Sequence, residues 1–480
     1  MEKVIQSRFS ESLSKYKTLM KELLEKLLDD YEYVSILSQE ARGKVYRVSK
    51  SGISIADSVL LAGKGTVIKI YDKKGFAEYS FNNFDKDFIK TIPDIIKDKL
   101  VPINKYITKC INNTEFPVPE DENITFSKSS SMLIDPEKLG DNVIIDELMK
   151  VHKASLDYDS QILDCTVSFQ YMHTDKFFLS ANKDLEQSLV WSTGFVQPIA
   201  SSGRETHYYY QPVSKLGGAE ILDDMMQHVA PSCKNVISLL SSTAITTGEY
   251  EVICMPDVTG MIVHEAFGHG VEMDMFVKDR ALARQYMGKK VASDIVTMHD
   301  KASGSIEAGS YFFDDEGTIS TDTVIIKDGI LVNGINDIQT SMNLNVSPTG
   351  NGRRESYERK AYTRMTNTYF EAGSNSLEDM IASVKDGILL ENASCGMEDP
   401  KNWGIQCMVN MAREIKDGKL TGKVFSPVVL SGYVPDLLQS ISMISNGFHL
   451  SGSGCCGKGY KEWVKVSDGG AAIKARVKLS

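Results

Sequence analysis

The 480-residue sequence has few cysteines, no long hydrophobic run and no excess of positive charge. Its eight cysteines are irregularly spaced, which excludes the dense disulfide framework of a small secreted domain and predicts reduced, mostly buried thiols. No run of 18 or more apolar residues occurs, so we expect no transmembrane helix. The first residues contain no apolar signal core, and we therefore expect a cytoplasmic protein.

The charge balance is acidic, with 53 lysines and arginines against 64 aspartates and glutamates, a net charge of −11. This sign argues against nucleic acid as a main partner and against docking on an anionic membrane. The 42% hydrophobic and 24% charged residues are ordinary for a globular protein and supply ample material for a core. The length predicts two or three domains.

Helical and strand patterns alternate in the first hundred residues. Residues 12–29 carry apolar side chains at helical spacing, and residues 85–98 predict a second helix. Short strands are predicted over residues 31–37, 45–48, 53–56 and 67–71, with turns at residues 41–44 and 62–65. We interpret residues 110–135, which are polar and contain Pro117 and Pro119, as a linker or long surface loop.

Further along the chain, strand signals come to dominate. Residues 136–156 and 219–229 predict helices, and residues 161–215 alternate like antiparallel strands, including 163–171 and 177–180. Beyond residue 235 the chain is rich in glycine and in turn dipeptides, which favour hairpins at residues 328–329, 333–334, 417–418 and 446–447. The predicted fold is α+β: an N-terminal α/β region with a mixed or antiparallel sheet, then a strand-rich C-terminal domain. The predicted domains are 1–109, 110–234 and 235–480, with the last boundary near residues 232–236.

One segment concentrates the residues that carry chemistry: residues 259–274, TGMIVHEAFGHGVEMD. His264 and His269 are two of only eight histidines, and Glu265 directly follows the first. Histidine is the commonest metal ligand, and a glutamate beside a zinc site can act as a general base. The spacing is one residue longer than the His-Glu-x-x-His pattern of zinc peptidases. The segment is therefore a candidate metal site, although histidine pairs of this kind are often structural.

The five-residue spacing sets a condition on the backbone. At about 100° per residue, positions five apart lie about 140° apart around a regular helix. If both rings bind one metal, the helix must end there or contain a π-type turn, which places positions i and i+5 on one side. Gly268 and Gly270 flank the second histidine and would permit this distortion.

A catalytic zinc usually has a third protein ligand, and the residues alone leave several candidates open. These candidates are Glu272, Asp274, His449, Cys455 and Cys456. The two cysteines lie in a glycine-rich stretch, residues 450–459, from which a thiolate can approach a site without steric conflict. The other cysteines are expected to be small buried residues, and the histidines outside the motif to be surface or hydrogen-bonded side chains.

The segment resembles the metal motif of the TldD/PmbA family, on its TldD, catalytic side. Further blocks resemble that family in the same order: residues 314–318 (DDEGT), 350–357 (GNGRRESY), 364–368 (RMTNT) and the loop at 451–458. The similar blocks run from about residue 255 to residue 458, whereas the first half is similar only in its pattern of strands and helices.

The resemblance implies a zinc peptidase of the cytoplasm that processes or degrades peptides and small unfolded proteins. It implies His264, His269 and Cys456 as zinc ligands and Glu265 as general base, with Cys455 the alternative thiol. Glu272 or Asp274 would orient a ligand imidazole. The partner expected is a second copy or a related non-catalytic TldE/PmbA-like subunit, forming a dimer around the peptide substrate.

Two other interpretations compete with this one. A binding or regulatory protein could hold a structural zinc closed by a fourth ligand, but such a site does not need Glu265. The family's old label as a modulator of DNA gyrase suggests DNA binding, which the net charge of −11 disfavours. For a peptide substrate we expect pairing with an edge strand, and Arg353 and Arg354 are either contacts for a substrate carboxylate or an ordinary solvated or ion-paired couple.

Overall fold

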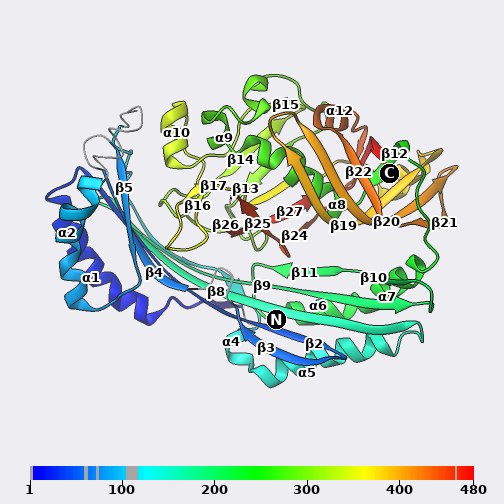
Figure 1. Cartoon of the computed structure of the whole chain (residues 1–480), viewed down its shortest axis with the longest axis horizontal. Coiled ribbons are helices and arrows are strands. Elements are labelled where there is room, and N and C mark those ends of the chain that lie inside the picture. The colour runs from blue at the N-terminus through cyan, green and yellow to red at the C-terminus, as the bar shows by residue number, and fades with distance from the viewer. Residues whose placement is uncertain (1–3, 59–62, 72–74, 104–116, 460–461) are drawn as a thin grey trace.

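A long curved sheet extends beneath the second half of the chain in the computed structural model (Figure 1). The structure describes residues 4–58, 63–71, 75–103, 117–459 and 462–480. The strands of this sheet are β2 (Tyr33–Ser49), β3 (Gly52–Asp57), β4 (Gly63–Tyr71), β5 (Phe76–Phe81), β6 (Ile124–Ser129), β8 (Ile162–Leu179), β9 (Lys183–Ser201), β10 (Thr206–Tyr208) and β11 (Gln211–Lys215). Their order is β10-β9-β8-β2-β4-β5, with β3 beside β2 and both β6 and β11 beside β9. Only the pairing of β6 with β9 is parallel, so the sheet is mixed, as predicted.

The central strands are longer than the sequence pattern indicates. The predicted turn at residues 41–44 is wrong, because these residues lie inside β2, which is 17 residues long. Gly43 signals close strand contact instead: a Cβ there would lie 2.1 Å from the carbonyl oxygen of Tyr171 on β8. The predicted strands at 163–171 and 177–180 likewise merge into β8. The turn predicted at residues 62–65 begins outside the described residues and continues as the start of β4.

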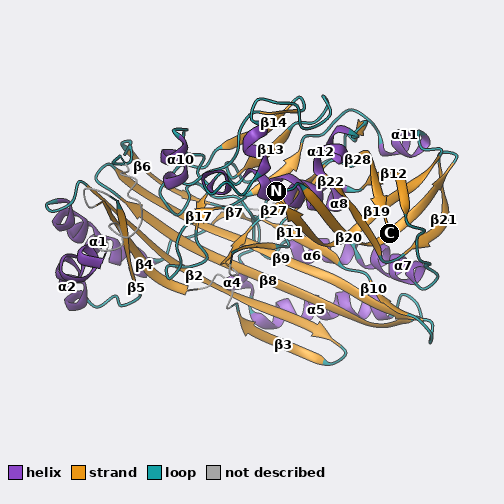
Figure 2. Cartoon of the chain, turned by 45° about the horizontal axis from the view of Figure 1, so that its top comes forward, coloured by secondary structure: helices purple, strands orange, loops and turns teal. Residues whose placement is uncertain are grey.

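The predicted helices of the first half are confirmed. They are α1 (Glu11–Leu28), α2 (Lys86–Ile95) with a π-turn η1 (Ile96–Leu100), α4 (Pro136–Leu139), α5 (Asp141–Leu156) and α6 (Ile221–Gln227). A further helix that the sequence pattern did not predict, α7 (Val229–Leu239), follows α6. The first two cover one end of the sheet, and Leu13 and Met20 of α1 are fully buried against it. The α5 and α7 helices contribute to a separate core against β8 and β9 (Figure 2). The position near residues 232–236 lies within α7, and strands from both sides of residue 110 share the long sheet.

The prediction of a linker over residues 110–135 is wrong in its second part. Residues 110–116 lie outside the described chain, but residues 124–129 form β6, whose alternating Ile124 and Phe126 face a small core that includes Phe313. Ser131 and Met132 form β7 (Ser131–Met132), which pairs with β1 (Ile5–Gln6). The polar composition hid these strands because only alternate side chains are apolar.

The second half contains two further sheets, which confirms the strand-rich prediction and the α+β class. The first comprises β12 (Gly248–Cys254), β19 (Asp386–Asp399), β20 (Gly404–Lys416), β21 (Lys419–Phe425), β22 (Val428–Tyr433), β23 (Met443–Ile444) and β28 (Ile473–Leu479). The second comprises β13 (Met298–Lys301), β14 (Asp322–Lys327), β15 (Ile330–Leu331), β18 (Asn367–Phe370), β24 (His449–Ser451) and β27 (Ser467–Gly470). The remaining strands described there form two short pairs. One joins β16 (Gly352–Arg353) to β17 (Tyr362–Thr363), and the other joins β25 (Cys455–Lys458) to β26 (Glu462–Lys465).

Local turn chemistry shapes two hairpins of this half. Asp328 and Gly329 join β14 to β15, and Asp417 and Gly418 join β20 to β21, all four with positive φ. This geometry matches the right-handed twist of the strands. The short helices here are α8 (Pro256–Met261), η2 (Ile262–Gly268), η3 (His269–Val271), α9 (Asp274–Val277), η4 (Leu282–Tyr286), α10 (Ile338–Leu344), α11 (Leu377–Ala382) and α12 (Val434–Gln439). Among the described residues, no helix is both long and apolar enough to span a bilayer.

Candidate metal centre

The two motif histidines lie on a helix that is buried on nearly every side. Strand β12 leads into α8, which starts at Pro256, a residue suited to the first helical turn. The chain continues as a π-helix over Ile262–Gly268 and a 3-10 turn over His269–Val271. Ile262, Val263 and Phe267 are fully buried in the main core of this half. Apolar packing therefore holds this irregular segment, as expected for a helix without a solvent face.

The π-helix satisfies the condition that the five-residue spacing imposes. The backbone amide of His269 donates to the carbonyl oxygen of His264, the i to i+5 bond of a π-turn. The two imidazole rings consequently lie on one side of the segment, with centroids 5.0 Å apart and planes at 84°. The predicted π-type distortion is present.

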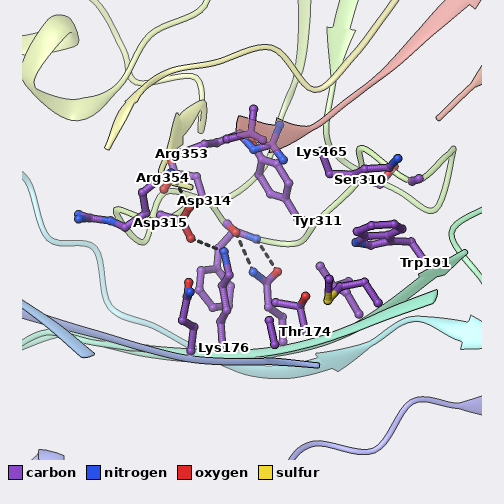
Figure 3. Close-up of a pocket in the computed structure, with 18 of the residues that line it drawn as sticks. Thr174, Lys176, Trp191, Ser310, Tyr311, Asp314, Asp315, Arg353, Arg354 and Lys465 are labelled. Carbon is purple, nitrogen blue, oxygen red and sulfur yellow. Dashed lines mark hydrogen bonds and ion pairs between the residues drawn. The ribbon is translucent and has the colours of Figure 1, made fainter. Parts of the chain in front are cut away.

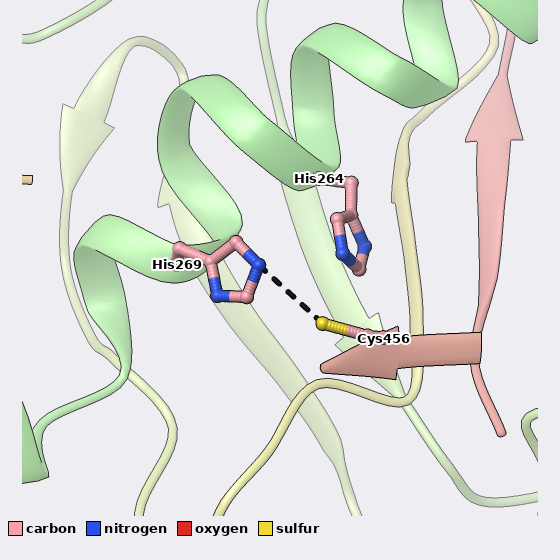
Figure 4. Close-up of side chains that lie close together, drawn as sticks. All are labelled: His264, His269 and Cys456. Atoms are coloured by element: carbon pink, nitrogen blue, oxygen red, sulfur yellow. Dashed lines mark hydrogen bonds between the residues drawn. The ribbon is translucent and has the colours of Figure 1, made fainter. Parts of the chain in front are cut away.

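Cys456 reaches the two rings from the far end of the sequence (Figure 4). It lies on β25, and its Sγ is 3.4 Å from Nε2 of His269. One donor atom from each of His264, His269 and Cys456 lies within 4.8 Å of the others. The neighbouring Cys455 is not in this group of donor atoms, nor is His449.

The donor set fits a zinc ion. Two imidazole nitrogens and one thiolate are ligands that zinc favours. Nδ1 of His264 is buried without a hydrogen-bond partner, as expected of an atom in a site that receives a ligand. Burial would raise the pKa of Cys456, but His264 and His269 lower it to about 4, which favours the thiolate form that binds metals.

Glu272 orients the second histidine. Its Oε2 lies 3.1 Å from Nδ1 of His269, so the other ring nitrogen is directed at Cys456. Burial would raise the pKa of Glu272, but Lys458, His269 and Arg364 hold it at about 2. Asp274, the other predicted candidate, instead binds Lys458 at 2.7 Å.

Arg364 is a component of the site that the residue-by-residue reasoning missed. It is 1% exposed, and its guanidinium donates to the carbonyl oxygens of Cys456 and Glu462, on the two strands of the β25–β26 hairpin. Its Nε lies 3.6 Å from Oε1 of Glu272. A single planar cation thus ties the thiol-bearing hairpin to the carboxylate behind His269. The only sequence signal was its membership of the 364–368 block.

The donor group opens into a cavity of about 950 Å³. Glu265, Cys455 and residues 394–398 of β19 line the same cavity. A Cβ added at Gly396 would lie 2.4 Å from Cγ of Glu265, so β19 passes directly against the glutamate. Both carboxyl oxygens of Glu398 are buried here without a hydrogen-bond partner. The structure thus places Glu265 in one hollow with the three donors.

Comparison with known proteins gives matches over both the second half and the whole chain. Residues 247–467 match the family model described as the PmbA/TldA metallopeptidase C-terminal domain. "Metalloprotease MJ0996" of Methanocaldococcus jannaschii is 26% identical over 460 residues, covering 96% of this chain and 99% of that one. "Zinc metalloprotease TldD homolog" of Saccharolobus solfataricus is 31% identical over 254 residues, 53% of this chain and 56% of that protein.

Solved structures are similar in fold over nearly the full length. TldE from Thermococcus kodakarensis has a TM-score of 0.74 at 17% identity, covering 96% of this chain and all of that one (100%). A Thermotoga maritima protein described as a candidate modulator of a DNA gyrase has a TM-score of 0.76 at 16% identity, with coverages of 97% and 100%. At these identities the likeness concerns the fold alone.

Proposed function

The chain belongs to the TldD/PmbA family of metallopeptidases, and we propose that it is a zinc-dependent peptidase acting on extended peptides or small unfolded proteins. The observation that carries this proposal is the group of His264, His269 and Cys456 beside Glu265 in one cavity. These three residues would hold the zinc, with Glu265 as general base. A zinc ion bound there would supply a Lewis acid that polarises the peptide carbonyl and acidifies a water molecule.

In this proposal Glu265 transfers the proton from the water to the leaving amine. Its carboxylate faces the cavity next to the donors, accepts a proton from the attacking water and passes it to the departing amine. Gly396 leaves the glutamate room, because any side chain at that position would collide with its Cγ. Glu272 holds His269 in one tautomer, with Nδ1 toward the carboxylate.

The cavity suits an extended substrate. Residues 394–398 of β19 and residues 455–459 border it, and among the described strands β25 pairs only with β26. The edge of β25 that faces away from β26 is therefore available for main-chain pairing with a peptide. Pairing of this kind recognises an extended backbone and imposes little sequence preference.

Zinc content tests the ligand set directly. We expect about one zinc per wild-type chain, measured by elemental mass spectrometry, and a large loss in Cys456→Ser. Cys455→Ser is the matched control, since this thiol lies one residue away and outside the donor group, and it should keep the metal. Equal zinc content in both variants would refute Cys456 as a ligand. A wild-type protein that contains no zinc even after zinc is supplied would refute the metallopeptidase proposal.

Peptide cleavage separates an enzyme from a protein with a structural zinc. Glu265→Gln should keep its zinc and lose about 10²- to 10⁴-fold in the rate of peptide hydrolysis, because only proton transfer is removed. The exposed Glu378→Gln is the control and should match the wild type. A wild-type protein that binds zinc tightly but cleaves no denatured protein or peptide mixture would favour the structural-zinc alternative.

We further propose a dimer with a second copy or with a TldE-like, non-catalytic subunit. The full-length likeness in fold to TldE supports related subunits of similar shape. Light scattering on the purified chain tests the first form. Co-purification with a co-expressed TldE-like chain tests the second, and a monomer under both conditions would refute the proposal.

A further inference from the structure

A second, smaller cavity lies between the long sheet and the second half of the chain. It has a volume of about 90 Å³, and its lining includes Lys176 and Trp191 from the sheet and Tyr311, Arg353 and Lys465 from the other side (Figure 3). This volume exceeds what a single water molecule needs and has room for a carboxylate group.

Lys465 reaches this cavity as a buried cation without an anionic partner. Its residue is 5% exposed, and its Nζ lies 4.6 Å from the centre of the Trp191 ring. Among the described residues, no carboxylate oxygen lies within 4.0 Å of Nζ, and burial lowers the pKa of Lys465 although Cys455, Glu307 and Asp468 oppose that shift. A buried ammonium in this position is costly unless a ligand neutralises it.

Arg353 brings a second unneutralised cation to the same cavity. Its Nη1 donates to the carbonyl oxygen of Met365 at 2.6 Å, and its guanidinium lies 5.1 Å from the centre of the Tyr311 ring. No carboxylate of the described chain pairs with it at ion-pair distance. The adjacent Arg354 differs: it is paired with Glu78 of β5 at 3.1 Å. The two arginines of the RR motif therefore have separate roles.

Three acidic residues line the cavity, Asp314, Asp315 and Glu355, and among the described residues none of them forms an ion pair with Lys465 or Arg353. Asp315 is bound to Lys176 and to the amide of Arg354. Asp314 accepts backbone hydrogen bonds from Glu316, Thr318 and Gly352, and burial raises the pKa of this carboxyl. Arg353 and Lys465 thus bring to the cavity two side chains with which none of these carboxylates pairs.

The cavity adjoins the proposed zinc site. Lys465 pairs with Cys455 across the β25–β26 hairpin, one residue from Cys456. Strand β26 contributes Val464 and Lys465 to this cavity, and β25 contributes Cys456 to the cavity of the proposed zinc site.

We propose that this cavity is a substrate subsite that binds a carboxylate of the peptide between the Lys465 ammonium and the Arg353 guanidinium. The inference rests on the proposed peptidase function and adds a substrate class to it: peptides with an anionic group near the cleaved bond. The carboxylate is either an acidic side chain or the C-terminus. Trp191 forms the wall that excludes water from the ion pair.

Binding of matched peptides tests the subsite. Isothermal titration of the full-length protein would compare acetyl-tetraalanine as free acid and as amide, and acetyl-Ala-Glu-Ala-amide with its glutamine analogue. In the wild type, one of the two acidic peptides should bind about tenfold more tightly than its neutral analogue, which is the affinity gain expected of one charge-assisted hydrogen bond. Preference in the first pair identifies the C-terminus, and preference in the second identifies an acidic side chain.

Variants of the two cations complete the test. Lys465→Met and Arg353→Gln should each abolish the acid preference, whereas Lys419→Met, on exposed β21, should keep it. Arg353→Gln retains a donor toward Met365, so one variant remains informative if the other does not fold. An unchanged preference in both variants, or none in the wild type, would overturn the subsite.

Cleavage assays keep this inference separate from the proposed function. Cleavage without any preference between acid and neutral peptides would refute the subsite and leave the peptidase standing. Acid-selective binding without cleavage of any peptide would support the subsite and refute the peptidase.

Discussion

The backbone amide of His269 donates a hydrogen bond to the carbonyl oxygen of His264, five residues earlier. In a regular helix this carbonyl would accept from residue 268, and the two rings would diverge by about 140°. The π-turn instead brings their centroids to 5.0 Å. A local change in helical hydrogen bonding therefore brings the two proposed zinc ligands to one side of the helix.

Gly268 provides the space that the π-turn needs. A Cβ at this position would lie 2.2 Å from Sδ of the fully buried Met365 and 3.2 Å from the carbonyl oxygen of Val263. Gly268→Ala should lower the free energy of unfolding by about 1–3 kcal/mol through overpacking and reduce zinc content. Chemical denaturation and elemental analysis measure both effects, and Gly447→Ala, with open space around it, is the control. Wild-type stability and zinc in Gly268→Ala would contradict the packing argument.

Glu272 should control metal affinity without being a ligand. Glu272→Gln removes the carboxylate from Nδ1 of His269 and leaves the buried cations of Lys458 and Arg364 without it. We expect zinc affinity to fall by about 10- to 100-fold, measured by competition with a chelator. Glu371→Gln, whose carboxylate contacts His299 instead, should bind zinc normally. An affinity equal to the wild type would show that Glu272 serves stability alone.

Arg364 should stabilise the thiol-bearing hairpin. Arg364→Lys keeps the charge but cannot reach the carbonyl oxygens of Cys456 and Glu462 together with Glu272. The expected loss is about 1–3 kcal/mol of unfolding free energy, because buried acceptors lose their donor. Hydrogen exchange in β25 and β26 should be faster in Arg364→Lys than in the wild type, whereas exchange in β20 should not change. Unchanged exchange in β25 and β26 would rule out this stabilising role of Arg364.

His173 should make stability depend on alkaline pH. Burial would lower its pKa, but Asp175 and Glu137 raise it from 6.5 to about 9. The folded state therefore holds this proton more tightly than the unfolded state. The stabilisation is fully present below pH 6.5 and is lost as the pH rises toward 9, an effect on the order of 2 kcal/mol.

Thermal unfolding between pH 6 and pH 10 checks this prediction. His173→Gln should be less stable than the wild type at pH 6, and the difference should shrink above pH 9. His207→Gln, a variant of a histidine elsewhere on the long sheet, should follow the wild-type curve. A difference that stays constant across the range would show that His173 acts by packing and not by charge.

Local patterns were enough for much of the fold. Helical spacing placed α1 within one residue at each end, and the Asp-Gly dipeptides marked two real hairpins. The turn predicted at Gly43 was wrong because glycine occurs both in tight turns and where two strands approach closely. Only the position of β8 in the folded chain shows that the second case applies. The prediction missed β6 inside a polar stretch because the strand that pairs with it, β9, lies about 60 residues further along the chain.

The sequence by itself determined the chemistry that is possible here: two histidines, a glutamate between them and two cysteines in a glycine-rich stretch. It also determined that a regular helix could not bring both rings to one metal. Only the tertiary structure decided which thiol meets them, because the β25–β26 register turns Cys456 toward His269 and Cys455 away from the donor group. It likewise decided that Arg354 forms an ion pair with Glu78, whereas Arg353 and Lys465 form none with the described carboxylates, because such contacts join residues that are far apart along the chain.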